Sequence, residues 1–172
     1  VTKSGGIINV SSEPGKGSIF NLFFPFAEKI SSGVPGMIEA GMPTGSERIL
    51  FVDDEVTLGD VAGEILNKLG YKVETLNSSV EALARIRAYP DYFDLLITDQ
   101  TMPVLSGVEL AKEALELKPG LPVILYTGFS TVIDGEEARK MGISEFLMKP
   151  VSMEELARVV RRTLDRKNKT VS

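Results

Sequence analysis

Short runs of apolar residues, bounded by polar turn residues, recur along most of this chain. These runs are too short for helices and are typical of buried strands. The five expected strands cover residues 49–52, 71–76, 93–99, 123–126 and 145–148. The run at 71–76 alternates between apolar and polar residues more than the others, which predicts a strand at the edge of a sheet.

Between these runs, apolar residues are spaced as on one face of a helix. Residues 58–69 predict one helix, which Gly70 ends. Three further helices begin at a serine that is followed three residues later by a glutamate, the spacing of a capping box. The three pairs are Ser78 with Glu81, Ser106 with Glu109, and Ser152 with Glu155. A shorter helix is expected near 135–141.

Strict alternation of five strands with five helices predicts an α/β fold. Right-handed crossovers then give a parallel sheet with helices on both faces. We expect a doubly wound, flavodoxin-like (βα)5 domain with the strand order 2-1-3-4-5.

The first part of the chain has a different pattern. Two β-rich runs, 5–11 and 18–24, are joined by a turn at 13–17 and predict a β-hairpin. An isolated hairpin is marginal in water, so we expect this one to be a remnant of something larger. Residues 27–47 are rich in Gly, Pro and Ser and predict a linker. The expected domains are therefore 1–26, the linker 27–47, and 48–168.

Composition excludes several classes of chemistry. The 172 residues contain no cysteine, which removes disulfides and thiolate metal sites and suits a cytoplasmic protein. They contain no histidine, which removes imidazole ligands, serine–histidine triads and any histidine phosphodonor. No apolar run is long enough to cross a bilayer, and no signal peptide is visible. We expect no membrane contact within this chain.

The charge balance bears on possible partners. A net charge of −5 argues against a nucleic-acid partner, which would require clustered positive charge. Six basic residues do lie late on the last helix, and we interpret them as a solvated face with cations near the helix C-terminus. They are Arg158, Arg161, Arg162, Arg166, Lys167 and Lys169.

Reactive polar groups follow four of the predicted strands. Asp53 and Asp54 come after the first, Asp99 after the third, Thr127 after the fourth and Lys149 after the fifth. In the expected strand order these strands are neighbours, so the groups share one crevice at the carboxyl edge of the sheet. Taken singly, each residue has a simpler interpretation as a turn, loop or cap residue. Their occurrence at corresponding strand ends favours a common site.

The chemistry of this set suggests phosphoryl transfer. Three clustered carboxylates repel one another, so a hard divalent cation is expected, and Mg²⁺ suits an oxygen-only site. Phosphoryl transfer needs a nucleophile in line, cations and positioned donors. Asp99 would be the phosphoacceptor, Lys149 would supply positive charge together with Mg²⁺, and the Thr127 hydroxyl would donate a hydrogen bond.

The residues of this site resemble the receiver domain of two-component response regulators, the CheY-like family. The resemblance runs from about Arg48 to about Arg166. It rests on Val52-Asp53-Asp54-Glu55, Ile97-Thr98-Asp99-Gln100-Thr101-Met102-Pro103, Tyr126-Thr127-Gly128 and Phe146-Leu147-Met148-Lys149-Pro150.

The resemblance implies a role for each residue of the site. Asp99 would be phosphorylated by a phosphohistidine donor, and Lys149 would pair with the phosphoryl group. Asp54, Asp99 and the backbone carbonyl of Thr101 would bind Mg²⁺ directly, with Asp53 acting mainly through water. Thr127 and Phe146 would be the switch residues. The Lys149–Pro150 bond would be cis.

A second resemblance covers the hairpin. Residues 5–20, followed by Leu22-Phe23-Phe24-Pro25, are similar to the closing strands of the ATP-binding domain of sensor histidine kinases. The nucleotide-binding boxes and the phosphodonor histidine of such kinases are absent from this sequence. The chain thus resembles the C-terminal part of a hybrid histidine kinase. It would catalyse only its own aspartyl phosphotransfer and dephosphorylation, while its parent would be a histidine kinase that can carry a membrane anchor.

Two alternatives remain open. The domain could be a non-catalytic pseudo-receiver that binds partners through its fourth and fifth helices, although a degenerate module need not keep the whole site. A haloacid-dehalogenase-like phosphatase would also use an Asp nucleophile, but Asp99-Gln100-Thr101 lacks the second acid of that motif. Under the leading hypothesis, the partners are a phosphohistidine donor and a histidine phosphotransfer protein. Because the hairpin leaves unpaired edges, a homodimer is a further possibility.

Overall fold

The structure, a computed structural model, describes residues 7–23, 41–128 and 141–170, with side chains up to residue 167. The chain divides into two units, Val1–Met37 and Ile38–Ser172. The helix predicted near 135–141 lies outside the described residues, except for Met141, which is in a turn.

The first unit contains the predicted hairpin. Strands β1 (Ile7–Glu13) and β2 (Gly17–Phe23) pair antiparallel, and both glycines of the turn have positive φ angles. The register pairs Ile8 with Leu22 and Val10 with Phe20. These pairs alternate along the strands, so the four apolar side chains share one face. Each of them is about half exposed.

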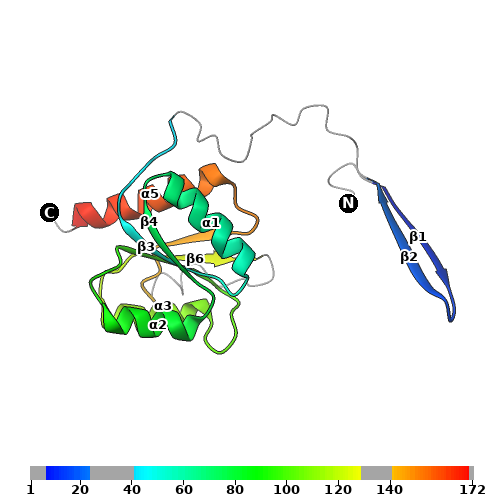
Figure 1. Ribbon diagram of the computed structural model, residues 1–172, viewed down its shortest axis with the longest axis horizontal. Coiled ribbons are helices and arrows are strands. Elements are labelled where there is room, and N and C mark those ends of the chain that lie inside the picture. Colours follow the sequence, from blue (N-terminus) through cyan, green and yellow to red (C-terminus); the bar gives the residue numbers. More distant parts are fainter. Residues whose placement is uncertain (1–6, 24–40, 129–140, 171–172) are drawn as a thin grey trace. The chain divides into compact units, whose positions relative to one another are not determined.

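The second unit is built on a five-stranded parallel sheet with the order β4-β3-β5-β6-β7 (Figure 1). Its strands are β3 (Arg48–Val52), β4 (Lys72–Leu76), β5 (Leu95–Asp99), β6 (Val123–Thr127) and β7 (Glu145–Met148). This order is the predicted 2-1-3-4-5, and β4 lies at an edge as expected. Strand β5 begins two residues later than predicted, where the carboxylate of Asp94 accepts the Arg48 N–H at 2.9 Å.

Helices cover both faces of this sheet (Figure 1). They are α1 (Val56–Lys68), α2 (Ser79–Ala88), α3 (Gly107–Leu117) and α5 (Met153–Thr170). Residues of α1 and α5 pack on one face around Phe51 and Ile97, while α2 and α3 pack on the other around Leu50 and Leu96. The two apolar clusters confirm the doubly wound, flavodoxin-like architecture. In the part of the chain that the structure describes, every helix is too short or too polar to span a bilayer.

The helix boundaries follow from the predicted local signals. At Ser106 both halves of the capping box are formed with Glu109. At Ser78 and Ser152 the serine oxygen accepts the N–H of the glutamate three residues on. Such caps each stabilise a helix by roughly 1 kcal/mol. After α1, Gly70 adopts a φ of 94°, which a residue with a Cβ rarely tolerates, and this ends the helix as predicted.

The last residues of the predicted linker are part of the second unit. Met42 packs against the α1–α5 cluster, and the Gly45 N–H donates to the Leu69 carbonyl at 3.1 Å. Arg161 on α5 donates to Glu47 Oε1 at 2.7 Å. These contacts hold the chain in place immediately before β3 begins.

Candidate functional site

The carboxyl ends of four neighbouring strands bring the predicted site residues together. The sheet register aligns Val52 with Thr98, Asp99 with Tyr126, and Thr127 with Met148. The residues at or just after these ends therefore face one another across the edge of the sheet. They are Asp53, Asp54, Asp99, Thr127 and Lys149.

Three carboxylates form the acidic part of the site. Asp53 and Asp99 are buried, Asp54 is exposed, and one oxygen of each lies within 4.8 Å of the others. A hard divalent cation prefers oxygen ligands of this kind. The donor set therefore fits Mg²⁺, with Asp54 open to solvent and able to leave room for water ligands.

Lys149 is the cation of the site. Its Nζ lies 2.7 Å from Asp99 Oδ1 and 2.9 Å from Asp53 Oδ2. Burial lowers the pKa of Lys149, but the hydrogen bonds to Asp99 and Asp53 outweigh it, so the pKa lies above its ordinary value. The ammonium therefore stays charged at neutral pH. The Lys149–Pro150 bond is cis, as expected.

Backbone N–H groups fix the other oxygen of each buried carboxylate. Asp53 Oδ1 accepts from the Glu55 N–H at 2.9 Å, and Asp99 Oδ2 accepts from the Thr101 N–H at 2.9 Å. Each carboxylate is thus held between a backbone donor and the ammonium. Thr101 lies two residues after Asp99 in the chain. That its backbone carbonyl binds the metal stays a prediction.

The helix that follows Asp99 also shapes the site. Gly107 opens α3, and a Cβ at this position would collide with the Asp99 backbone carbonyl. Only glycine permits this approach of the helix to the strand end. The first residue of α3 therefore lies directly against the strand end that carries Asp99.

The two predicted switch residues lie in neighbouring strands, Thr127 at the carboxyl end of β6 and Phe146 two residues before the end of β7. Thr127 is buried, and its hydroxyl donates to the Gly128 carbonyl at 3.2 Å. Phe146 is partly buried and packs against the cluster formed with α2 and α3. Their movement on phosphorylation stays a prediction.

Tyr126 belongs to the motif Tyr126-Thr127-Gly128, but no role of its own was predicted for it. Its ring lies next to Lys149, with the ring centroid 4.7 Å from Nζ. Burial raises the pKa of Tyr126, with Lys149 acting in the opposite direction. In the sequence, Tyr126 reads as one more apolar residue of a buried strand, so no pattern pointed to this contact.

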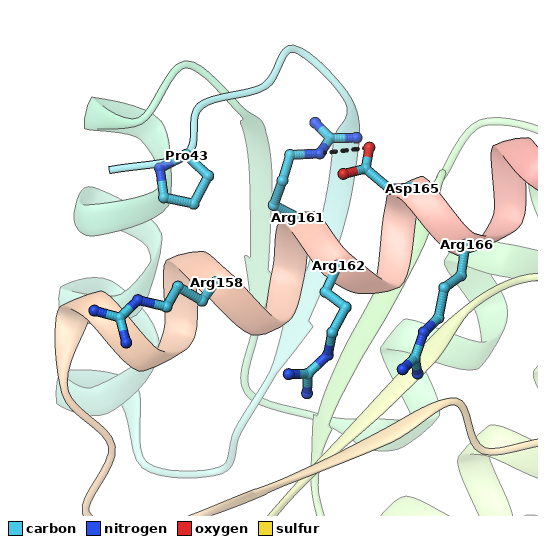
Figure 2. A pocket seen from close by; sticks show the side chains of 6 residues that line it. All are labelled: Pro43, Arg158, Arg161, Arg162, Asp165 and Arg166. Carbon is cyan, nitrogen blue, oxygen red and sulfur yellow. Dashed lines mark hydrogen bonds and ion pairs between the residues drawn. The ribbon is translucent and has the colours of Figure 1, made fainter. Parts of the chain in front are cut away.

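The predicted basic face of α5 lines a depression of about 420 Å³ (Figure 2). Acidic partners are Glu154 for Arg158, Glu47 and Asp165 for Arg161, and Glu145 for both Arg162 and Arg166. Figure 2 shows Arg158, Arg161 and Arg162 pointing in different directions from the helix. These three guanidinium groups therefore do not converge on one anion, and Arg162 and Arg166 already share Glu145.

Comparison with known proteins identifies the family. The model of the response regulator receiver domain matches residues 49–161. The transcriptional regulatory protein ZraR of Salmonella typhimurium is 33% identical over 123 residues, which are 72% of this chain and 27% of that protein. The sensor kinase CckA of Brucella abortus is 29% identical over 178 residues, covering 98% of this chain and 19% of that protein. The chain thus spans about a quarter or less of the length of these relatives.

Solved structures agree with the sequence comparison. A response regulator receiver domain protein from Clostridium thermocellum has a TM-score of 0.68 at 32% identity, over 72% of this chain and 98% of that one. A CheY-like receiver domain protein from Methanospirillum hungatei has a TM-score of 0.67 at 32% identity, over 73% and 99%. With the family model matching more than half of the residues, this chain belongs to the receiver domain family of two-component signal transduction systems.

Proposed function

We propose that Asp99 accepts a phosphoryl group from a phosphohistidine in a two-component phosphorelay. The observation that carries the proposal is the convergence of Asp53, Asp54, Asp99 and Lys149 at one sheet edge. Proteins with a non-catalytic receiver fold have no need of this charge arrangement. The site therefore favours phosphoryl chemistry over a pure interaction module.

The residues of the chain can carry the transfer as follows. An Asp99 carboxylate oxygen attacks phosphorus while the N–P bond of the donor breaks and the imidazole leaves with the electron pair, which forms an acyl phosphate. Lys149, already 2.7 Å from Asp99, neutralises charge that develops on the phosphoryl oxygens. The Thr101 N–H keeps the carboxylate oriented, and Thr127 would donate its hydroxyl to the phosphoryl group.

A divalent cation completes the charge balance. Asp53, Asp54 and Asp99 would hold Mg²⁺, with the Thr101 carbonyl as a further ligand. When bound, the ion would supply positive charge to the phosphoryl oxygens. The acyl phosphate can then be passed to a histidine phosphotransfer protein or lost to water.

Phosphorylation by a small donor tests this proposal. The chain is incubated with Mg²⁺ and phosphoramidate, and intact mass is measured. We expect the wild type to gain one phosphoryl group and Asp99→Asn to gain none. A wild type that stays unmodified, or an Asp99→Asn variant that is modified equally, would contradict the assignment.

We further propose that the domain belongs to a hybrid histidine kinase. The similarity to the sensor kinase CckA extends over 98% of this chain, hairpin included, whereas that to ZraR covers 72%. The apolar face of Ile8, Val10, Phe20 and Leu22 suits closing strands of a larger sheet, which the rest of an ATP-binding domain would cover. Such a kinase would phosphorylate the receiver in the cytoplasm and can be anchored in the membrane.

Incubation with ATP tests the proposed hybrid context. The chain incubated with labelled ATP should incorporate no phosphate, because the phosphodonor histidine and the nucleotide boxes are not in this sequence. Label on Asp99 from ATP alone would contradict this.

Light scattering with and without residues 1–47 tests whether the exposed hairpin drives formation of a homodimer. Such a dimer would be lost on truncation.

A further inference from the structure

Tyr126 occupies an unusual place between the core and the charged site. It lies in β6 with only 9% of its surface exposed, and it packs within the α1–α5 cluster. Phe51 meets its ring edge-on, with centroids 6.2 Å apart and planes at 61°. The ring is therefore held by the core, while Lys149 Nζ lies 4.7 Å from its centroid.

Tyr126 also touches both chain segments that the transfer uses. Its carbonyl accepts the Gln100 N–H at 2.9 Å, immediately after Asp99. Its ring lies in the apolar cluster against which Val151 packs, two residues beyond Lys149. The backbone of Tyr126 thus contacts the strand end that carries Asp99, while its ring contacts Lys149.

The ring acts on the ammonium through its electron distribution. The face of an aromatic ring is negative, so it attracts a cation within about 6 Å of its centroid, most strongly where water is excluded. Lys149 has a flexible four-carbon stem and is partly exposed, so its ammonium could otherwise swing toward solvent. The ring favours the conformers in which Nζ stays beside Asp99 and Asp53.

We propose that Tyr126 is a positioning residue, whose aromatic ring holds the Lys149 ammonium against the phosphoacceptor site. This inference rests on the proposed phosphoacceptor function of Asp99. It predicts that the ring, and not the hydroxyl, governs the rate of phosphorylation.

The test compares three variants in the full chain with phosphoramidate and Mg²⁺. Tyr126→Phe keeps the ring and should react at nearly the wild-type rate. Tyr126→Leu removes it and should react about three- to thirtyfold more slowly. Tyr71→Leu is the matched control, because Tyr71 is a buried tyrosine of the same cluster with no contact to Lys149 among the described residues. It should lose stability and keep its rate.

A second readout is independent of phosphorylation. Protons that lie over an aromatic face resonate upfield, so the ε-methylene signals of Lys149, assigned with Lys149→Arg, should be shifted in the wild type and in Tyr126→Phe. The shift should vanish in Tyr126→Leu. Its absence from the wild type would overturn the proposal even if Asp99 is phosphorylated.

The kinetic outcomes distinguish the function of Asp99 from the role of Tyr126. If the wild type stayed unphosphorylated but its Lys149 ε-methylene signals were shifted upfield, the phosphoacceptor role of Asp99 would be wrong, and the contact between Tyr126 and Lys149 would stand. Equal rates for all variants would overturn the role of Tyr126 alone. Equal slowing of Tyr126→Phe and Tyr126→Leu, or slowing of Tyr71→Leu to the same extent, would also overturn it, since the hydroxyl or general stability would then be the cause.

Discussion

At the sheet edge and beside α5, the receiver unit has clusters in which one charge is shared by two opposite charges. At the sheet edge, Lys149 is shared by Asp53 and Asp99, at 2.9 and 2.7 Å. Beside α5, Glu145 of β7 is shared by Arg162 and Arg166 of the helix, at 3.2 and 2.6 Å. We call this the α5 cluster. The distances are alike, but the side chains of Asp53 and Asp99 are 1% and 6% exposed, against 50% and 64% for the two arginines.

This difference in burial decides what each cluster can do. Exposed pairs are solvated and screened and contribute roughly 0–1 kcal/mol. A buried carboxylate depends on its cation, because removing the partner leaves a charge that water cannot reach. The buried cluster is therefore able to respond strongly when a phosphoryl group or a metal changes its charge, whereas the α5 cluster is not.

The largest expected effect is that of Lys149→Met. Without a divalent cation, the variant should lose about 2–3 kcal/mol of unfolding free energy, because two buried carboxylates then face each other. The partial exposure of Lys149 keeps the loss below the upper range for buried pairs. Urea denaturation measures the loss. Lys118→Met is the control, since Lys118 is similarly buried but bonds the neutral Phe93 carbonyl and has only the fully exposed Asp91, at 4.0 Å, as an acidic partner. A loss no larger than that of the control would contradict the comparison.

The second largest expected effect is the stabilisation of the fold by Mg²⁺. At a concentration ten times its dissociation constant, the ion should raise the unfolding free energy of the wild type by about 1.4 kcal/mol. Asp54→Asn removes one ligand and should reduce this gain, whereas Asp60→Asn, an acid of α1 outside the three-carboxylate cluster, should not. Equal gains in both variants would remove Asp54 from the metal site.

Arg161 and Glu47 form a pair of intermediate burial, 2.7 Å apart. Burial raises the pKa of Glu47, but the hydrogen bonds from Arg161 and the backbone outweigh it, so the pKa lies below its ordinary 4.5. A carboxylate with a lowered pKa stabilises the fold above its ordinary pKa, and this stability is lost as pH falls through the lowered value. Arg161→Met should cost about 1 kcal/mol at pH 7. The cost should shrink below pH 4.5, and a constant cost would contradict the linkage.

The carboxyl-edge site could be predicted because its residues stand where a buried strand stops. An acid, hydroxyl or lysine directly after an apolar run must lie at the strand end, and parallel strands place these ends together. Asp99 and Lys149, 50 positions apart in sequence, therefore meet at 2.7 Å. The expected strand order followed from the same alternation of strand and helix patterns.

Features that depend on the direction of a side chain or on a local backbone angle could not be predicted from the sequence. Tyr126 differs in no pattern from its apolar neighbours, so its contact with Lys149 could not be foreseen. Val104 adopts a φ of 69° with no glycine to mark the turn, because the Pro103 carbonyl accepts the Leu105 N–H at 2.8 Å around it. The predicted solvated face of α5 holds for Arg158, Arg162 and Arg166, but not for Arg161, whose side chain is only 20% exposed. The sequence also did not reveal Glu145 as the common partner of Arg162 and Arg166.

The smallest expected effect belongs to Glu145→Gln. Both arginines keep their hydration and most of their donors when the charge is lost, so the unfolding free energy should change by about 0.5 kcal/mol or less. High salt should abolish even this change, since the Debye length falls to about 3 Å at 1 M. The cost of Lys149→Met should persist in the same salt, because its carboxylates are buried. If Glu145→Gln cost as much as Lys149→Met, or if salt weakened both equally, burial would not be what separates the two clusters.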